Sequence, residues 1–108
     1  MIRGDVLWVD LDPVRGSEAN KRRPCVVVSN DASNRAAATL TVVPCTSVVR
    51  DVYPFEVYLE GVLDVPSKAQ AHQVRTVTKR RVVSRPIGHL DPVTLLQLDD
   101  ALRLHLAL

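Results

Sequence analysis

Four polar side chains of this 108-residue chain are of the types needed to break a phosphodiester bond of RNA. RNA carries its own nucleophile in the 2′-hydroxyl, so a protein must add a proton acceptor, a proton donor and positive charge around the phosphorus. An arginine, a hydroxyl, a carboxylate and an imidazole supply these functions without a metal ion. The sequence offers them as Arg23, Thr46, Glu18 and His72. Metal-independent cleavage of RNA is therefore one chemistry open to this chain.

Other catalytic and metal-binding patterns are missing from the sequence. No serine–histidine–aspartate or cysteine–histidine spacing stands out, and the four isolated glycines form no phosphate-binding loop. The three histidines are scattered and there is no CxxC motif, so we expect neither a zinc site nor another cofactor. Cys25 and Cys45 each lie in an apolar run. A disulfide or redox pair is one interpretation, but we favour two small buried residues in a reducing cytosol.

The elements that must position these residues are short strands followed by one helix. β-Branched or alternating runs predict strands at residues 5–11, 24–30, 39–46, 55–59 and 69–77. Residues 13–23 are polar and predict a loop, and residues 31–37 predict a loose crossing with one helical turn. Pro44 predicts a bulge or a sheet edge. In the last strand, His72 and Gln73 would point to opposite faces.

A helix is predicted at the end of the chain. Asp91 supplies an N-cap carboxylate and Pro92 the proline favoured at the first helical position. Asp99 and Arg103 are spaced for an ion pair one turn apart. The apolar stripe of this helix would consist of Leu95, Leu98, Leu102 and Leu106. The prediction is a single domain over residues 1–108, mostly β (α+β), with a C-terminal amphipathic helix.

The net charge of +2 hides an uneven distribution of 14 basic and 12 acidic residues. Residues 65–90 hold six basic residues and no acidic one, and the loop 13–23 holds four basic residues against Glu18. If the two basic segments share a face, they form a cationic groove suited to a phosphate backbone. For Lys79-Arg80-Arg81 alone, a solvated turn is an equal alternative.

Composition and hydropathy bound the remaining possibilities. Apolar residues make up 46% and charged residues 24%, which is a globular balance. Aromatic residues make up only 4%, which argues against a base-stacking sheet of the RNA-recognition-motif kind. No secretory signal and no apolar run long enough to span a membrane is visible, so we expect a cytoplasmic protein with no membrane partner.

The motifs occur together in the order of a known family. They are Arg3-Gly4-Asp5, Trp8 to Pro13, Gly16-Ser17-Glu18, Arg23-Pro24, Val26-Val27-Val28, Val43-Pro44-Cys45-Thr46, Tyr53-Pro54-Phe55-Glu56-Val57 and Gln73-Val74-Arg75-Thr76. Over essentially its whole length the chain resembles the MazF/PemK toxin endoribonucleases. That resemblance implies a small SH3-like barrel of the CcdB/PemK kind with a C-terminal helix, assembled as a homodimer. It also implies metal-independent, sequence-specific cleavage of single-stranded RNA, held inactive by an antitoxin whose flexible acidic segment covers the RNA groove.

The resemblance also assigns roles to individual residues. Arg23 matches the catalytic arginine that precedes a proline, Thr46 the catalytic threonine, and Glu18 a loop glutamate near the active site. Gln73 matches a family residue that contacts RNA. Arg75 and Lys68 complete this part of the predicted RNA-binding set because they lie in the basic segment 65–90, the second of the two along the chain. The loop that borders the substrate groove contributes Ser17, Asn20 and Lys21. Without the resemblance, Arg23 would be interpreted as an ion-pair partner of Glu18, and Thr46 as an ordinary strand residue.

One position departs from the family pattern. Many members carry an acidic residue before the glutamine of the QVR segment, where this chain has His72. An imidazole titrates near neutrality, so His72 could share proton transfer with Arg23 and Thr46. Alternatively it contacts RNA or fills space. We expect Trp8 to pack in the core or a dimer interface, and Asp10 and Asp12 to cap turns rather than to bind a metal.

Two other functions fit the same fold. A gyrase poison of the CcdB type acts through a tryptophan near the end of its C-terminal helix, and this chain ends Leu104-His105-Leu106-Ala107-Leu108 without one. A nucleic-acid-binding module without enzymatic activity is the other alternative. The RNA sequence that is cut would depend on the loops 13–23 and 47–53.

Overall fold

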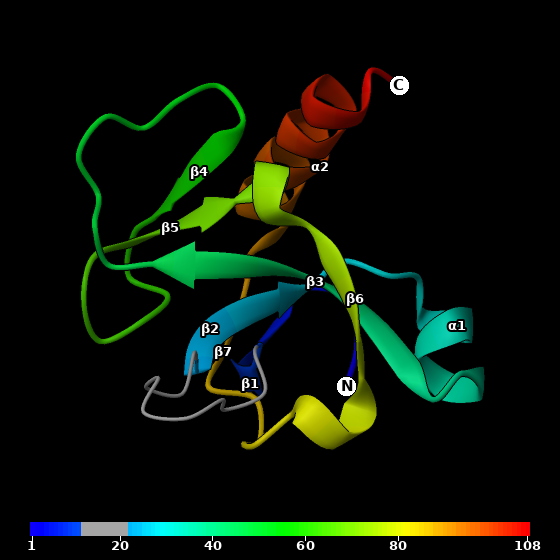
Figure 1. The fold of residues 1–108 in the computed structure, drawn as a ribbon. Coiled ribbons are helices and arrows are strands. Elements are labelled where there is room, and N and C mark those ends of the chain that lie inside the picture. The colour runs from blue at the N-terminus through cyan, green and yellow to red at the C-terminus, as the bar shows by residue number, and fades with distance from the viewer. Residues whose placement is uncertain (12–21) are drawn as a thin grey trace, which may run out of the picture.

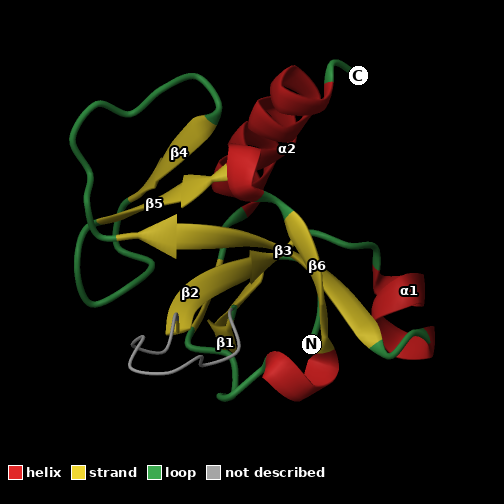
Figure 2. Cartoon of the chain, viewed as in Figure 1, coloured by secondary structure: helices red, strands yellow, loops and turns green. Residues whose placement is uncertain are grey.

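A computed structural model of the chain describes residues 1–11 and 22–108. Within these residues, antiparallel strands form one sheet with the spatial order β4-β5-β3-β2-β1-β7, and β6 also pairs with β3. The strands are β1 (Asp5–Asp10), β2 (Arg22–Val27), β3 (Thr39–Thr46), β4 (Glu56–Leu59), β5 (Ser67–Gln70), β6 (Arg75–Thr78) and β7 (Gly88–His89). The sheet curls strongly, as Figures 1 and 2 show, which gives the predicted mostly-β architecture of a half-open barrel.

The helical elements lie outside this sheet. They are α1 (Asp31–Ala36), α2 (Pro92–Leu106) and the 3-10 turns η1 (Ala71–Gln73) and η2 (Lys79–Arg81). The predicted start of α2 is confirmed, because Asp91 Oδ1 accepts the backbone N–H of Thr94 at 2.7 Å and Pro92 opens the first turn. In the part of the chain that is described, no helix is long and apolar enough to cross a membrane.

The apolar stripe of α2 is buried only in part. Leu98 is buried, while Leu95 and Leu102 pack against the core from its edge. Leu106 is 50% exposed, so the prediction that it belongs to the buried stripe is wrong. The reason is geometric: α2 contacts β4 and η1, and its last turn extends past them (Figure 1).

The predicted ion pair between Asp99 and Arg103 is also wrong. Asp99 instead accepts a hydrogen bond from Arg3, whose guanidinium is held in place by the carbonyl of Val28 at 2.9 Å. Arg103 instead forms an ion pair with Asp100, with 3.1 Å between Nη1 and Oδ1. A partner from the N-terminal segment therefore replaces the one expected within the helix.

Two hydrophobic clusters fill the two faces of the sheet, because side chains alternate along each strand. One cluster lies against α2, and its strand residues are Val6, Val26, Val43, Cys45, Val57, Leu59 and Ala69. The other lies on the opposite face and consists of Leu7, Val9, Leu11, Cys25, Val27, Leu40, Val42 and Val77. Nearly continuous β-branched runs such as that of β2 follow from burial on both faces.

The predicted strand over residues 69–77 is interrupted, which corrects that prediction. β3 pairs with β6 at one end (Leu40 opposite Val77) and with β5 at the other (Cys45 opposite Ala69), and the register differs by three residues between the two. The three residues of η1 are extruded to make up this difference. Pro44 of β3 lies at the break, where its missing N–H costs no ladder hydrogen bond. His72 and Gln73 are therefore on a turn rather than on opposite faces of a strand.

Candidate active site

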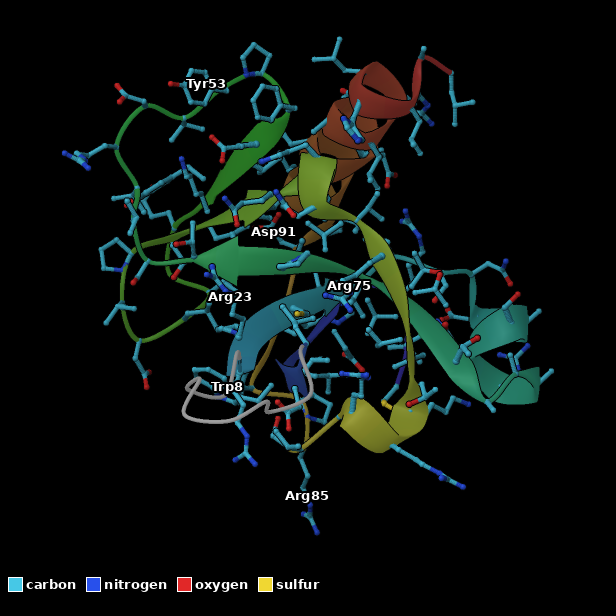
Figure 3. The ribbon with its side chains drawn as sticks, viewed as in Figure 1. Trp8, Arg23, Tyr53, Arg75, Arg85 and Asp91 are labelled. Atoms are coloured by element: carbon cyan, nitrogen blue, oxygen red, sulfur yellow. The ribbon has the colours of Figure 1, made fainter. Side chains whose placement is uncertain are left out.

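Arg23 and Thr46 lie side by side where β2 begins and β3 ends. In the pairing of these strands Cys25 is opposite Pro44, and the same antiparallel register, continued two residues further, places Arg23 opposite Thr46. Residues two apart on a strand share a face, so both side chains lie on the face of the cluster that contains Cys25. Figure 3 shows Arg23 at this point, beside the arrowhead of β3. The strand pairing thus brings together two of the four residues that the sequence proposed as catalytic.

Two hollows meet at this pair. The first has a volume of about 680 Å³ and is lined by Trp8, Arg22, Arg23, Pro24, Cys45, Thr46, Ser47, Val48, Leu63, Asp64, Val65, Ser67 and Ile87. The second has a volume of about 400 Å³ and is lined by Leu11, Arg23, Pro44, Thr46, Gln70, Gln73 and Arg75. Arg23 and Thr46 line both. A phosphate bound between them would have room for a nucleotide on either side.

The hydroxyl of Thr46 is oriented by its own loop. Its Oγ1 accepts the backbone N–H of Val48 at 3.2 Å. A hydroxyl has one hydrogen and two lone pairs, so this bond leaves the Thr46 hydrogen available to donate. Arg23, which is half-buried, carries a guanidinium that stays positive and can donate two parallel hydrogen bonds to a phosphate. The pair can therefore hold a phosphate and donate to its oxygens.

A second arginine lies near the first. Burial raises the pKa of the Cys25 thiol to about 12, while the positive charges of Arg75 and Arg23 act to lower it. Both guanidinium groups thus act on the same buried atom, and both line the smaller hollow. Cys25 and Cys45 are buried and free, which confirms the prediction of two small core residues rather than a disulfide.

Trp8 borders the larger hollow, where sequence reasoning had not placed it. It is opposite Pro24 in the β1–β2 pairing, and it is 39% exposed. The prediction that it packs in the core is therefore wrong, and the alternative that it packs in a dimer interface stays a prediction. It lines this hollow together with Arg22 and Arg23, so its exposed part offers a surface on which a base could stack.

His72 is turned toward α2 rather than toward Arg23. Its imidazole meets the ring of Phe55 edge-on, with centroids 4.5 Å apart, and lies 6.4 Å from the ring of His105. It lines neither hollow at Arg23 and Thr46. The structure therefore does not bring His72 together with Arg23 and Thr46, and Glu18 lies outside the described residues. The extrusion of η1 explains this, because it removes His72 from the strand.

Lys68 is buried, which removes the basis for predicting that it contacts RNA. Its ammonium group donates to Glu56 Oε1 at 2.9 Å, and its side chain is only 7% exposed. The other RNA-contact candidates among the described residues, Gln73 and Arg75, are exposed and line the smaller hollow.

The second basic segment does not form one continuous cationic face. Arg81 Nη1 donates to the carbonyls of Asp10 and Leu11 at 3.2 and 3.0 Å, and Lys79 donates to the carbonyl of Asn34. Arg85 points away from the sheet in Figure 3. Of the basic residues in the described part of the chain, those that line the two hollows are Arg22, Arg23 and Arg75.

Several predicted residues lie outside the described part of the chain. They are Ser17, Glu18, Asn20, Lys21 and the turn residue Asp12. Conversely, sequence reasoning missed the segment Leu63 to Val65 in the lining of the larger hollow, whereas Ser47 and Val48 belong to the loop 47–53 that was expected to influence the choice of RNA sequence. Leu63, Asp64 and Val65 lie in a loop, and nothing in their type or spacing marks them as part of a site.

Residues 2–106 match the model of the PemK-like, MazF-like toxins of type II toxin-antitoxin systems. The chain belongs to this family. Endoribonuclease MazF9 of Mycobacterium tuberculosis is 52% identical over 116 residues, which cover 100% of this chain and 98% of that protein. Endoribonuclease EndoA of Bacillus subtilis is 36% identical over 110 residues, which cover 98% of this chain and 94% of EndoA.

Solved structures of family members confirm the predicted fold. A MazE–MazF complex from Deinococcus radiodurans has a chain that matches with a TM-score of 0.86 and 27% identity, over 100% of this chain and 96% of that one. An endoribonuclease from a Mycobacterial species, solved with its cognate antitoxin, matches with a TM-score of 0.82 and 27% identity over the same shares. The curled sheet with a C-terminal helix is therefore that of the MazF toxins.

Proposed function

We propose that this chain is a sequence-specific endoribonuclease toxin that cuts single-stranded RNA and thereby inhibits translation and growth. The observation that carries the proposal is the placement of Arg23 and Thr46 where two hollows meet, on a member of a family whose relatives are endoribonucleases. Arg23 and Thr46 are the two residues common to the linings of both hollows, so a single strand that occupied both would contact them. The scissile phosphate would therefore lie between them.

The chemistry follows from what each group can do. The 2′-oxygen attacks the neighbouring phosphorus and loses its proton, and the bond from phosphorus to the 5′-oxygen breaks. The departing 5′-oxygen takes up a proton from water, which leaves a 2′,3′-cyclic phosphate and a 5′-hydroxyl. Arg23 stays protonated, stabilises the charge on the phosphorane and donates a hydrogen bond to the leaving oxygen, while Thr46 adds a further hydrogen bond. Glu18 is our candidate proton acceptor, because His72 is turned away from this pair.

RNA binding would extend from the reacting phosphate into the smaller hollow. Gln73 and Arg75 line it, and an exposed amide and guanidinium there can bind base edges and phosphates. We retain Ser17, Asn20 and Lys21 in the RNA-binding set on the strength of their place in the family motif. Lys68 is no longer included, because its ammonium group is buried against Glu56.

The assembly would be that of the family: a cytoplasmic homodimer held inactive by a cognate antitoxin. Several of the matching solved structures contain toxin and antitoxin together. An acidic, partly disordered antitoxin segment is complementary to the arginines around the hollows. The exposed apolar side chains of α2 that are available to a second copy are Val93, Leu96, Leu104 and Leu106.

Sequencing the cut ends of an RNA pool tests the proposed function. The purified chain is incubated with a mixed pool of single-stranded RNA in the presence of EDTA, and new ends are mapped and typed. Discrete cuts at a short shared sequence, with 2′,3′-cyclic phosphate ends, are expected. Protection of RNA without cuts would favour a binding module, and trapping of gyrase on DNA without RNA cuts would favour a gyrase poison.

A further inference from the structure

We propose that Lys68 is a positioning residue that holds the loop 47–55 in the shape that selects the nucleotides beside the cut. The inference rests on the proposed function and deepens it, because it assigns part of the sequence specificity to a residue that does not touch RNA. It starts from the burial of Lys68, which is unusual for a lysine. Both it and its partner Glu56 are almost fully covered.

Lys68 lies beside Thr46 on the neighbouring strand. In the pairing of β3 with β5, Lys68 is directly opposite Thr46. The loop 47–55 begins immediately after Thr46, and its first residues, Ser47 and Val48, line the larger hollow. Val48 also donates its N–H to the Thr46 hydroxyl. The shape of this loop thus determines both the wall of the hollow and the orientation of Thr46.

The ammonium group of Lys68 binds the far side of the same loop. Its Nζ donates to the carbonyl of Arg50 at 3.1 Å and lies 3.4 Å from the carbonyl of Asp51. Asp51 has a φ of 54°, in the left-handed region that a residue with a Cβ rarely adopts. The buried ammonium thus binds two successive carbonyls at the turn where the backbone takes this conformation.

The end of the loop is held by the partner of Lys68. Glu56 Oε1 accepts both the Lys68 ammonium at 2.9 Å and the backbone N–H of Tyr53 at 3.1 Å. The Tyr53 ring lies 5.9 Å from Lys68 Nζ and stacks on Phe55. Figure 3 shows Tyr53 on the part of the loop that leads into β4. One buried ion pair therefore fixes the loop near its middle and near its end.

A double substitution, Lys68→Met with Glu56→Gln, removes the tether with little other damage. No buried charge is left without a partner, and the glutamine can still accept the Tyr53 N–H. The matched control is Arg3→Met with Asp99→Asn, which removes an ion pair and a carbonyl contact away from both hollows. Circular dichroism and thermal melting establish that each variant is folded. If the double variant does not fold, Lys68→Arg takes its place: the planar guanidinium keeps the charge but not the geometry of the bonds to the Arg50 and Asp51 carbonyls, so the same direction of change is expected.

The decisive readout is the ratio of cleavage rates at the preferred RNA sequence and at the next-best one. We expect this ratio to fall roughly 3- to 10-fold in the tether variant, the factor that one misplaced hydrogen bond produces, and to stay unchanged in the control. Trp8 is the single tryptophan and shares the hollow with Ser47 and Val48, so its fluorescence reports the loop without RNA. We expect stronger quenching by acrylamide in the tether variant alone.

The outcomes separate the two proposals. A parent chain that cuts RNA, together with a folded tether variant that keeps the parent's site ratio, overturns the role of Lys68 and leaves the endoribonuclease intact. An equal change in the control also overturns it, because general destabilisation would then be the cause. A parent chain that cuts no RNA contradicts the proposed function itself.

Discussion

The imidazole of His72 lies edge-on against Phe55, with ring centroids 4.5 Å apart, and it lines neither of the hollows that meet at Arg23 and Thr46. This contact is produced by the extrusion of η1 from the strand ladder. The histidine that the sequence proposed as a proton carrier thus packs against an aromatic ring, away from both hollows. The proton acceptor of the proposed reaction must then be sought elsewhere.

Substitution of His72 by glutamine should leave the dependence of RNA cleavage on pH unchanged. Glutamine does not titrate, so a histidine that moves a proton in the reaction would flatten or shift one limb of the profile when replaced. We expect the same profile and a rate within roughly threefold of the parent, since packing against Phe55 is retained in part. Single-turnover rates between pH 5 and 9 provide the measurement. Loss of one limb would restore His72 to the mechanism.

Breaking the buried ion pair from one side should cost far more stability than removing it whole. Lys68→Met leaves the Glu56 carboxylate buried without a counter-charge, which costs about 3 to 5 kcal/mol. Lys68→Met with Glu56→Gln should cost less than half of that, because no charge remains buried. Urea unfolding of both variants checks this order. Equal losses would mean that the pair is solvated in solution.

The stability contributed by this pair should fall in acid. Burial acts to raise the pKa of Glu56, but hydrogen bonds from Lys68 and from the N–H of Tyr53 outweigh it and hold the pKa below its ordinary value of 4.5. The unfolded chain therefore binds more protons than the folded one around that value, and stability decreases as pH falls through it. The difference in unfolding free energy between the parent and the double variant should be constant from pH 7 to about pH 5 and shrink below it. A difference that grows in acid would contradict the assignment.

Both cysteines should resist thiol reagents in the folded protein. Burial raises the pKa of Cys25 to about 12 and raises that of Cys45 further, so almost no thiolate is present at pH 8. With Ellman's reagent we expect labelling at least roughly a hundredfold slower in buffer than in urea. Rapid labelling of either thiol without denaturant would contradict the burial described for β2 and β3.

Much of this molecule could be predicted from its sequence, for physical reasons that differ between elements. β3 was predicted at its observed bounds because β-branched residues fill both of its faces, and the start of α2 because its capping group is local. The interruption at η1 could not be predicted, because it arises from the register of β3 with two different strands. Alternation of small and polar residues continues through the turn and conceals it.

Only those residues of the candidate site that belong to sequence motifs could be predicted correctly. Arg23 and Thr46 were proposed from family motifs, and strand pairing brings them together. Lys68 was predicted to bind RNA because it lies in a basic segment of the sequence. Its partner Glu56 lies on another strand, so the buried ion pair could not be predicted from that segment alone. Trp8 was wrongly placed in the core because a strand pattern does not distinguish a buried side chain from one that borders a hollow.

The central claim is that Arg23 and Thr46 act on the phosphate that lies between them. Arg23→Ala removes the charge that stabilises the phosphorane, and Thr46→Val removes a hydroxyl with little change in shape. Thr46→Ser, which keeps the hydroxyl, is the matched control.

The most direct test is the single-turnover rate of cleavage of one RNA that contains the mapped site, measured in EDTA for the parent and these variants. We predict a loss of roughly a hundredfold or more for Arg23→Ala and roughly tenfold or more for Thr46→Val, with Thr46→Ser close to the parent. Folded Arg23→Ala and Thr46→Val proteins that cut this RNA at the parent rate would contradict the account.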